Sequence, residues 1–316
     1  MGLRMSNGPS PPSIQRHSVN GVRSSLSRLG EGEGEGEGDQ VTRSFFYPIT
    51  MRHAHFLVVL CLFLMTLTSS PARAGRSCEE KPPTPVDIQK GLHLALKTKQ
   101  VLMQSDATLA LLGRVGSDLS AYGLRYSHAG FVWRDHPKGQ WLVIHALNRC
   151  ATATSAVFDE GLGNFFLDDP FAYEVLVVIP SRETQEKLAW LLASTLSEQL
   201  HQATYNMLAY PWSTRYQNSN QWLLELLAAA IAPAAHINSR TQAQQWLRQQ
   251  GYRPSEVKVP ALQRLGARLF SANIQFDDHP FADRIAGQYQ VVTVESVVGF
   301  LQRVDPHTTR QVIRLD

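Results

Sequence analysis

The sequence changes character at about residue 75, and the part before that point cannot form a hydrophobic core. Residues 1–50 are rich in Ser, Pro, Gly and Arg and contain the repeat GEGEGEGEG. Such a composition buries too little apolar surface to offset the entropy that is lost on ordering. We therefore expect residues 1–50 to be a disordered leader, or an extension upstream of a natural translation start at Met51. The folded core is expected to follow.

Residues 51–74 have the layout of a secretory signal peptide. They begin weakly basic, continue with an apolar run that starts at Phe56, and end in the small-x-small sequence ARA at 72–74. A transmembrane helix needs roughly 20 apolar residues, so the short run favours a signal peptide over a membrane anchor. We predict export to the periplasm or the extracellular space, a mature protein that starts near Gly75, and membrane contact only through the signal segment.

The cysteines are consistent with export. Of the three in the chain, Cys61 lies in the signal segment, which leaves Cys78 and Cys150. In an oxidising compartment this pair predicts a disulfide, worth about 4 kcal/mol in the chain-entropy model. Two unpaired thiols are the alternative. The net charge of +3 comes without a basic cluster, so no nucleic-acid partner is expected.

Helix and strand patterns are mixed along the mature chain. Expected helices span 86–113 (one or two), 182–204, 219–231 and 260–270, and expected strands span 125–133, 141–148 and 174–180. A Gly- and Asp-rich stretch, 161–173, is expected to be a loop. The segment after Pro233 adds a helix that ends at Gly251, a strand near Glu256, and a strand and a helix between 288 and 303. Strands and helices neither alternate strictly nor separate, which predicts an α+β fold.

The first two expected strands flank the short turn RDHPKGQ and so predict a β-hairpin that carries two histidines. Side chains alternate between the two faces of a strand, so His128 and His145 share a face only if paired residues have numbers that sum to an odd value. A pairing of Trp133 with Gln140 satisfies this condition. A register shift by one residue would separate the two histidines.

The segment YQNSNQWLLELL places a serine at the expected start of a helix. Asn218 is a good N-cap and Gln221 completes a pattern like a capping box, which puts Ser219 in the first turn. The backbone amides and the helix dipole there favour developing negative charge. This suits a nucleophile and an oxyanion, with Asn218 and Asn220 as extra donors. The alternative is that Asn-Ser-Asn only caps the helix.

The motifs SHAGFVW and VIHA together resemble the histidine hairpin of the NlpC-type cell-wall peptidases and their papain-like relatives. In the circularly permuted members this hairpin comes first, and the nucleophilic cysteine follows at the start of a helix, where YQNSNQWLLELL resembles it. The resemblance implies a papain-like core over 76–232, with an antiparallel sheet and packed helices, and a C-terminal accessory α/β region over 233–316 packed on it. It also implies Ser219 as nucleophile, His128 as base and His145 as the residue that orients the base.

The chain as a whole also resembles a family of secreted bacterial proteins of unknown function that carry an SNQW segment at this position. The main departure from the papain-like pattern is a serine where the nucleophilic cysteine belongs, since Cys150 lies too close to His145 to take that role. Two functions follow. One is a cell-envelope amide or ester hydrolase or acyltransferase, with peptidoglycan peptides or lipid acyl groups as substrates. The other is a catalytically inactive binding or assembly module that keeps the groove. No cofactor or metal is expected.

Further residues have chemistry-bearing types outside these motifs. In FDDHP, the side chains of Asp277, Asp278 and His279 could form a site or a solvated turn. Acidic residues and a histidine in two other turns could bind a metal but fit turn caps better: Asp135, His136, Asp168 and Asp169. Four aromatic residues before Ser219 could form one wall of a substrate groove or simply pack on the core: Tyr205, Tyr210, Trp212 and Tyr216.

Overall fold

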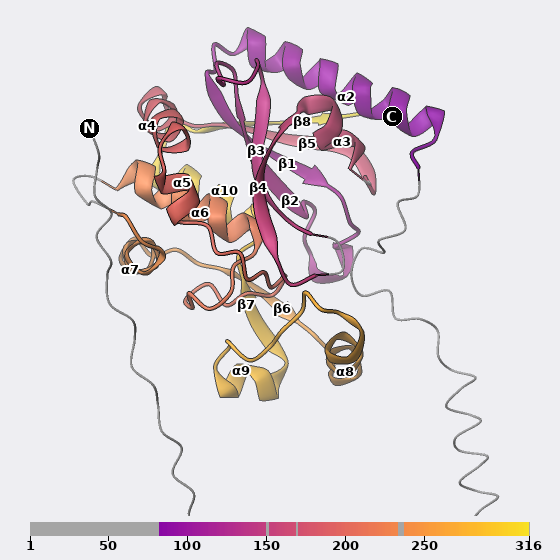
Figure 1. Ribbon diagram of the computed structural model, residues 1–316, viewed down its shortest axis with the longest axis vertical. Helices are drawn as coiled ribbons and strands as arrows, with labels where there is room; N and C mark the ends of the chain where they lie inside the picture. Colours follow the sequence, from indigo (N-terminus) through magenta and orange to yellow (C-terminus); the bar gives the residue numbers. More distant parts are fainter. Residues whose placement is uncertain (1–81, 150–151, 169, 233–236, 316) are drawn as a thin grey trace, which may run out of the picture. The chain divides into compact units, whose positions relative to one another are not determined.

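The computed structural model describes residues 82–149, 152–168, 170–232 and 237–315 (Figure 1). The predicted leader, the predicted signal peptide and the cysteines Cys78 and Cys150 lie outside the described residues, so export and the disulfide stay predictions. Among the helices that are described, none is long and apolar enough to cross a membrane.

The centre of the fold is a six-stranded antiparallel sheet with the strand order β4-β3-β2-β1-β5-β8. Helices pack on it, which confirms the predicted α+β class with an antiparallel sheet. The strands are β1 (Leu109–Val115), β2 (His128–Trp133), β3 (Leu142–Asn148), β4 (Ser155–Gly161), β5 (Ala172–Ile179) and β8 (Thr309–Arg314).

Alternating side chains of the sheet feed two separate hydrophobic cores. Val132 points into the smaller core, which is covered by helices α2 (Pro85–Gln104) and α3 (Leu162–Leu167). Phe131 points into the larger core on the other face. The helices of that core are α4 (Arg182–Ala193), α5 (Leu196–Gln199), α6 (Ser219–Ile231), α7 (Arg240–Gln249) and α10 (Val294–Val304).

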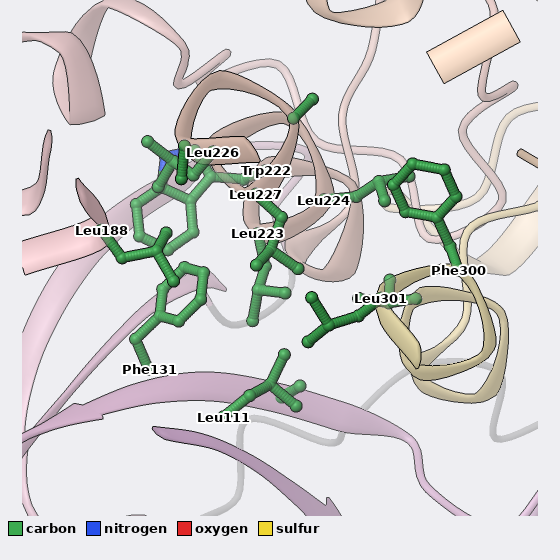
Figure 2. Close-up of a cluster of buried hydrophobic side chains, with 14 of the residues drawn as sticks. Leu111, Phe131, Leu188, Trp222, Leu223, Leu224, Leu226, Leu227, Phe300 and Leu301 are labelled. Atoms are coloured by element: carbon green, nitrogen blue, oxygen red, sulfur yellow. The ribbon is translucent and has the colours of Figure 1, made fainter. Parts of the chain in front are cut away.

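Helix α6 is the centre of the larger core, and 11 of its 13 residues are buried. Figure 2 shows Trp222 and the leucines of α6 between Phe131 of the sheet on one side and Phe300 and Leu301 of α10 on the other. A helix that is apolar on all sides needs neighbours on all sides. This explains why the run WLLELLAAAI has almost no polar face.

The C-terminal region contributes to two parts of the molecule. A two-stranded sheet of β6 (Ser255–Lys258) and β7 (Gln288–Val291) and helix α8 (Ala261–Phe270) contribute to a small third core, and the short helix α9 (Phe281–Ala286) lies before β7 without a buried residue. The same region supplies β8 to the main sheet and α10 to the larger core. Residues after 232, expected to pack on the core as an accessory layer, therefore also complete that core.

An ion-pair cluster attaches β8 to β5. The buried carboxylate of Glu174 accepts hydrogen bonds from Arg125 at 2.8 Å, Arg314 at 2.5 Å and the hydroxyl of Tyr126 at 2.8 Å. Burial by itself would raise the pKa of Glu174, but these donors lower that pKa to about 2. The C-terminal strand is thus held by charge as well as by backbone pairing.

Several expected elements were wrong, each for an identifiable reason. The expected helical segment 86–113 ends at Gln104, and its last residues begin β1, because a fully buried central strand reads as a continuous apolar run without a helical or alternating period. The expected loop 161–173 contains α3. The expected helix 182–204 breaks at Ser194 into α4 and α5. The edge strands β4 and β8 were not predicted, since few of their residues are buried.

Candidate functional site

The two histidines of the hairpin lie side by side. Strand β2 pairs with β3 so that Trp133 lies opposite Leu142, which makes the predicted partner Gln140 wrong by two residues. A shift of two residues keeps the sum of paired numbers odd and leaves the faces unchanged. His128 and His145 therefore share a face, and the Nε2 of His128 lies 2.8 Å from the Nδ1 of His145.

Gly130 makes room for this pair. A Cβ atom at Gly130 would lie 3.0 Å from the Cβ of His145 and 2.7 Å from a methyl group of Val143. Any larger residue would therefore push the second histidine away from the first. The spacing His-x-Gly in the first strand thus has a steric role in the contact between the imidazoles.

A carboxylate that the sequence did not reveal lies behind the second histidine. Oε1 of Glu160, in β4, is 3.3 Å from the Nε2 of His145. This distance is short enough for an ion pair, but the two groups form no hydrogen bond in the described structure. In the contact between the two imidazoles, one ring nitrogen donates and the other accepts, so the rings hold each other in place. Glu160 was missed because its edge strand was missed.

The start of α6 is capped by Asn218, as predicted. Its Oδ1 accepts from the backbone N–H of Gln221 at 2.8 Å, and its Nδ2 donates to the carbonyl of Val292 at 3.2 Å. The reciprocal half of the expected capping box is absent from the described contacts, because the side chain of Gln221 donates to the carbonyl of Pro211 at 3.3 Å instead. Because Asn218 caps the helix, the hydroxyl of Ser219 is not needed as an N-cap. The side-chain amide of Asn218 is already used in its hydrogen bonds to Gln221 and Val292.

Two polar side chains flank Ser219. Burial raises the pKa of Tyr205 to about 12, and a hydrogen bond with Ser219 partly opposes that rise. Tyr205 is thus protonated at neutral pH and can donate a hydrogen bond. Asn220 is 8% exposed, and its Oδ1 has no hydrogen-bond partner in the described part of the chain. A buried polar atom without a partner is costly unless a ligand or water satisfies it.

These side chains line a single pocket of about 850 Å³ at one end of the main sheet. Ser219, Asn220 and Tyr205 contribute from the side of α6, and His128 contributes from the beginning of β2. The floor continues to the β6–β7 sheet and to α8. This volume lies within the range of about 300–1,000 Å³ that is typical of small-molecule sites.

A buried ion pair lies at the same end of the pocket. Arg114 is opposite His128 in the pairing of β1 with β2, and its guanidinium donates to the carboxylate and the carbonyl of Asp168. Both Arg114 and Asp168 line the pocket. Arg114 was not predicted as a site residue, since the residues of its strand up to 113 were expected to be helical, and Asp168 was considered only as a turn cap or a metal ligand.

Ser219 and His128 reach this pocket from opposite faces of the sheet. The rings of His128 and His145 lie 6.1 and 5.4 Å from the ring of Phe165 in α3, whereas α6 packs on the other face. Between residues 82 and 315, none of the described hydrogen bonds joins Ser219 to His128. The structure thus brings the predicted nucleophile and base into one pocket without a direct hydrogen bond.

The cluster at Asp277 to His279 is structural. Oδ2 of Asp278 accepts from the backbone N–H of Tyr210 at 2.8 Å, and the Nε2 of His279 lies 2.6 Å from the carbonyl oxygen of Leu208. Asp277 pairs with Arg215 at 2.8 Å. The expected solvated turn was wrong for Asp278 and His279, because their side chains are buried and their contacts hold the preceding segment in place.

Other expectations for the site have mixed outcomes. Of the four aromatic residues before Ser219, Tyr205 lines the pocket, while Tyr210, Trp212 and Tyr216 do not. Asp135 pairs with Arg134 at 3.0 Å, and Asp169 lies outside the described residues. In the part of the chain that the structure describes, no group of three or more His, Cys, Asp or Glu side chains could hold a metal ion.

Fold and site together define an α+β protein with a half-open pocket at one end of an antiparallel sheet. Residues 101–301 match DUF2145, a family of uncharacterized proteins conserved in bacteria, and the chain belongs to this family. The matched segment includes the histidine hairpin and the start of α6. No match was found among curated proteins or among solved structures. The predicted bacterial family is confirmed, and the resemblance to NlpC-type hydrolases stays a hypothesis.

Proposed function

We propose that the protein is a papain-like hydrolase or acyltransferase of the cell envelope that cleaves an amide or ester bond with Ser219 as nucleophile and His128 as base. The observation that carries the proposal is that these two residues, chosen from motifs far apart in the sequence, line the same pocket. Export through residues 51–74 would place this activity in the periplasm or outside the cell.

In the proposed chemistry each group has one role. The hydroxyl oxygen of Ser219 attacks the carbonyl carbon, and its proton passes to the imidazole of His128, which His145 orients. The backbone amides at the start of α6, with the hydroxyl of Tyr205 and the amide of Asn220, stabilise the oxyanion. His128 then gives the proton to the leaving amine or alcohol, and water or a second alcohol releases the acyl group from the serine.

The proposal sets two requirements. The hydroxyl of Ser219 and the imidazole of His128 have to come within hydrogen-bond reach when substrate is bound, as catalytic contacts often tighten on binding. In addition, a serine loses its proton during the attack, whereas a cysteine beside an imidazolium is already ionised. Turnover is therefore expected to be slower than in a papain-like enzyme with a cysteine nucleophile.

A second candidate function is supported by the two faces of the sheet. Because α6 packs on the face opposite to the ring of His128, the pocket fits a binding or assembly module of the cell envelope that holds a ligand without turnover. In this candidate the contact between His128 and His145 supports the wall of the pocket only.

A fluorophosphonate probe tests the enzyme. We expect the wild-type protein to be labelled, Ser219→Ala to be unlabelled, and His128→Ala to be labelled at least about 100-fold more slowly, as is typical for loss of a general base. Ser155→Ala is a matched control, because Ser155 is a buried serine 2.9 Å from the Nε2 of His201 and outside the pocket. Labelling that survives in Ser219→Ala, or that disappears in Ser155→Ala, would refute the assignment.

A cysteine variant tests the geometry if the wild-type protein is not labelled. Ser219→Cys should react with iodoacetamide faster when His128 is present than in the double variant with His128→Ala, because a nearby imidazole promotes the thiolate. Equal rates would exclude the hydrolase and leave the binding module.

A further inference from the structure

The pocket has an apolar half that the proposed chemistry does not use. Away from Ser219 it is lined by side chains of the β6–β7 layer and its neighbours: Val257, Val259, Ile274, Phe276 and Val291. Residues of the same small core continue this surface, with Leu124 and Leu208 packed beside it. One cavity therefore offers polar groups at the start of α6 and a set of apolar side chains from the small sheet and its neighbours.

The charges of the pocket favour some ligands over others. Among the described lining residues, the acidic and basic side chains are Arg114, His128 and Asp168, and Arg114 and Asp168 are paired with each other. A cell-wall peptide, with its several carboxylates, would find no matching set of cations here. An apolar chain would replace water along the apolar half, with a gain in affinity of up to about fourfold for each buried methylene.

The polar end offers a place for one head group. The Oδ1 of Asn220 is buried and has no partner in the described structure, while Tyr205 and Ser219 offer hydroxyls next to it. Since the amide of Asn220 can present either its N or its O, it can bind a carbonyl, a carboxyl or a hydroxyl group. One compact polar head with one apolar tail satisfies both ends of the cavity.

We propose that the pocket binds a fatty acyl group, with its chain along the β6–β7 layer and its carbonyl at Ser219 and Asn220. The position of the carbonyl at Ser219 rests on the proposed function, whereas the position of the acyl chain along the β6–β7 layer does not. Of the two substrate classes that the resemblance to cell-envelope hydrolases implies, the pocket thus favours lipid acyl groups over peptidoglycan peptides.

Binding of saturated fatty acids to Ser219→Ala tests the chain site without turnover. With acids of four to twelve carbons, measured by calorimetry, the Kd is expected to fall by up to about fourfold for each added methylene until the chain fills the apolar half. A Kd that does not depend on chain length would overturn the proposal.

A blocking variant locates the chain. Ile274→Trp should fill the apolar half and weaken binding of a ten-carbon acid at least tenfold, while Ile88→Trp, on the exposed side of α2, should leave it unchanged. Ile274→Ala, which removes apolar surface without filling the space, should weaken binding less than Ile274→Trp does, and thermal unfolding of both variants shows that the position tolerates substitution. Unchanged binding in Ile274→Trp would contradict the site.

Fatty-acyl binding and enzymatic activity can be tested independently of each other. Nitrophenyl esters of the same acids, given to the wild-type protein, report turnover. Chain-dependent binding of acids without ester cleavage or probe labelling would support the acyl site and exclude the enzyme. Ester cleavage that needs Ser219 but is indifferent to chain length would support the enzyme and overturn the acyl site.

Discussion

Helix α6 carries two buried polar clusters that differ in how well their atoms are satisfied. In its middle, the carboxylate of Glu225 is fully buried and accepts from Gln217 at 2.7 Å, Arg240 at 2.8 Å and Gln244 at 3.0 Å. At its start, Asn220 is almost as buried, but its Oδ1 has no partner in the described structure. Fully satisfied groups hold the fold together, whereas an unsatisfied group at a pocket wall is positioned for something that binds.

The cluster around Glu225 also supports the site. Arg240 donates to the carbonyl of Thr214 at 2.8 Å, and Gln244 donates to that of Ser213 at 3.1 Å, so α7 holds the segment that leads into α6. The hydrogen-bond network of Glu225, Arg240 and Gln244 therefore holds the segment that precedes α6 in place. Burial raises the pKa of Glu225, although Arg240, Gln244 and Gln217 act in the opposite direction.

The largest effect is expected from Arg240→Ala. It leaves the carboxylate of Glu225 buried without its counter-charge, which should lower the free energy of unfolding by about 3–5 kcal/mol. Urea unfolding followed by circular dichroism measures this loss. As a control, Arg248→Ala removes an exposed arginine that lies 4.7 Å over the ring of Trp212 and should cost at most about 1 kcal/mol.

The loss of stability in Arg240→Ala is expected to depend on pH in a defined direction. Because folding raises the pKa of Glu225, the folded state holds that proton more tightly than the unfolded state does, and stability falls as pH rises above the ordinary glutamate pKa. Without Arg240 this slope should steepen. The deficit of Arg240→Ala relative to wild type should thus shrink toward acid pH; a deficit that is the same at pH 5 and pH 8 would contradict the role of Glu225.

A smaller effect is expected from Asn218→Ala. It removes the cap of α6 and the bond to Val292, for an expected loss of about 1–2 kcal/mol. Asn218→Ser retains an N-cap oxygen and should recover part of that loss. Thermal unfolding of the two variants tests the order, and equal stability of Asn218→Ala and wild type would show that the cap contributes nothing.

The smallest effect on stability is expected from Asn220→Ala, two residues along the same helix. Since its Oδ1 makes no hydrogen bond in the described structure, the free energy of unfolding should change by no more than about 0.5 kcal/mol. Fatty-acid binding, or probe labelling if the enzyme is active, should nevertheless weaken by about tenfold or more. If Asn220→Ala destabilises the protein as much as Asn218→Ala does, the distinction between the two clusters is wrong.

Sequence patterns found the local parts of the site more reliably than its surroundings. The cap at Asn218 follows from residues within one helical turn, and the shared face of His128 and His145 follows from the parity of the register. The exact register was wrong by two residues because the turn is longer than expected. The side-chain partner of Gln221 was also wrong, since Pro211 competes for it from a segment that only the tertiary structure brings near.

The sequence by itself determined the α+β class and the start of the buried helix at Ser219, because helix capping depends on neighbouring residues. Only the tertiary structure decided the register that brings His128 beside His145 and the position of Glu160 behind His145. It also decided that the serine and the histidine approach one pocket from opposite faces of the sheet and that apolar side chains of the small sheet line this pocket. These features depend on contacts between distant segments, whose geometry is set by how the two cores pack and not by any local pattern.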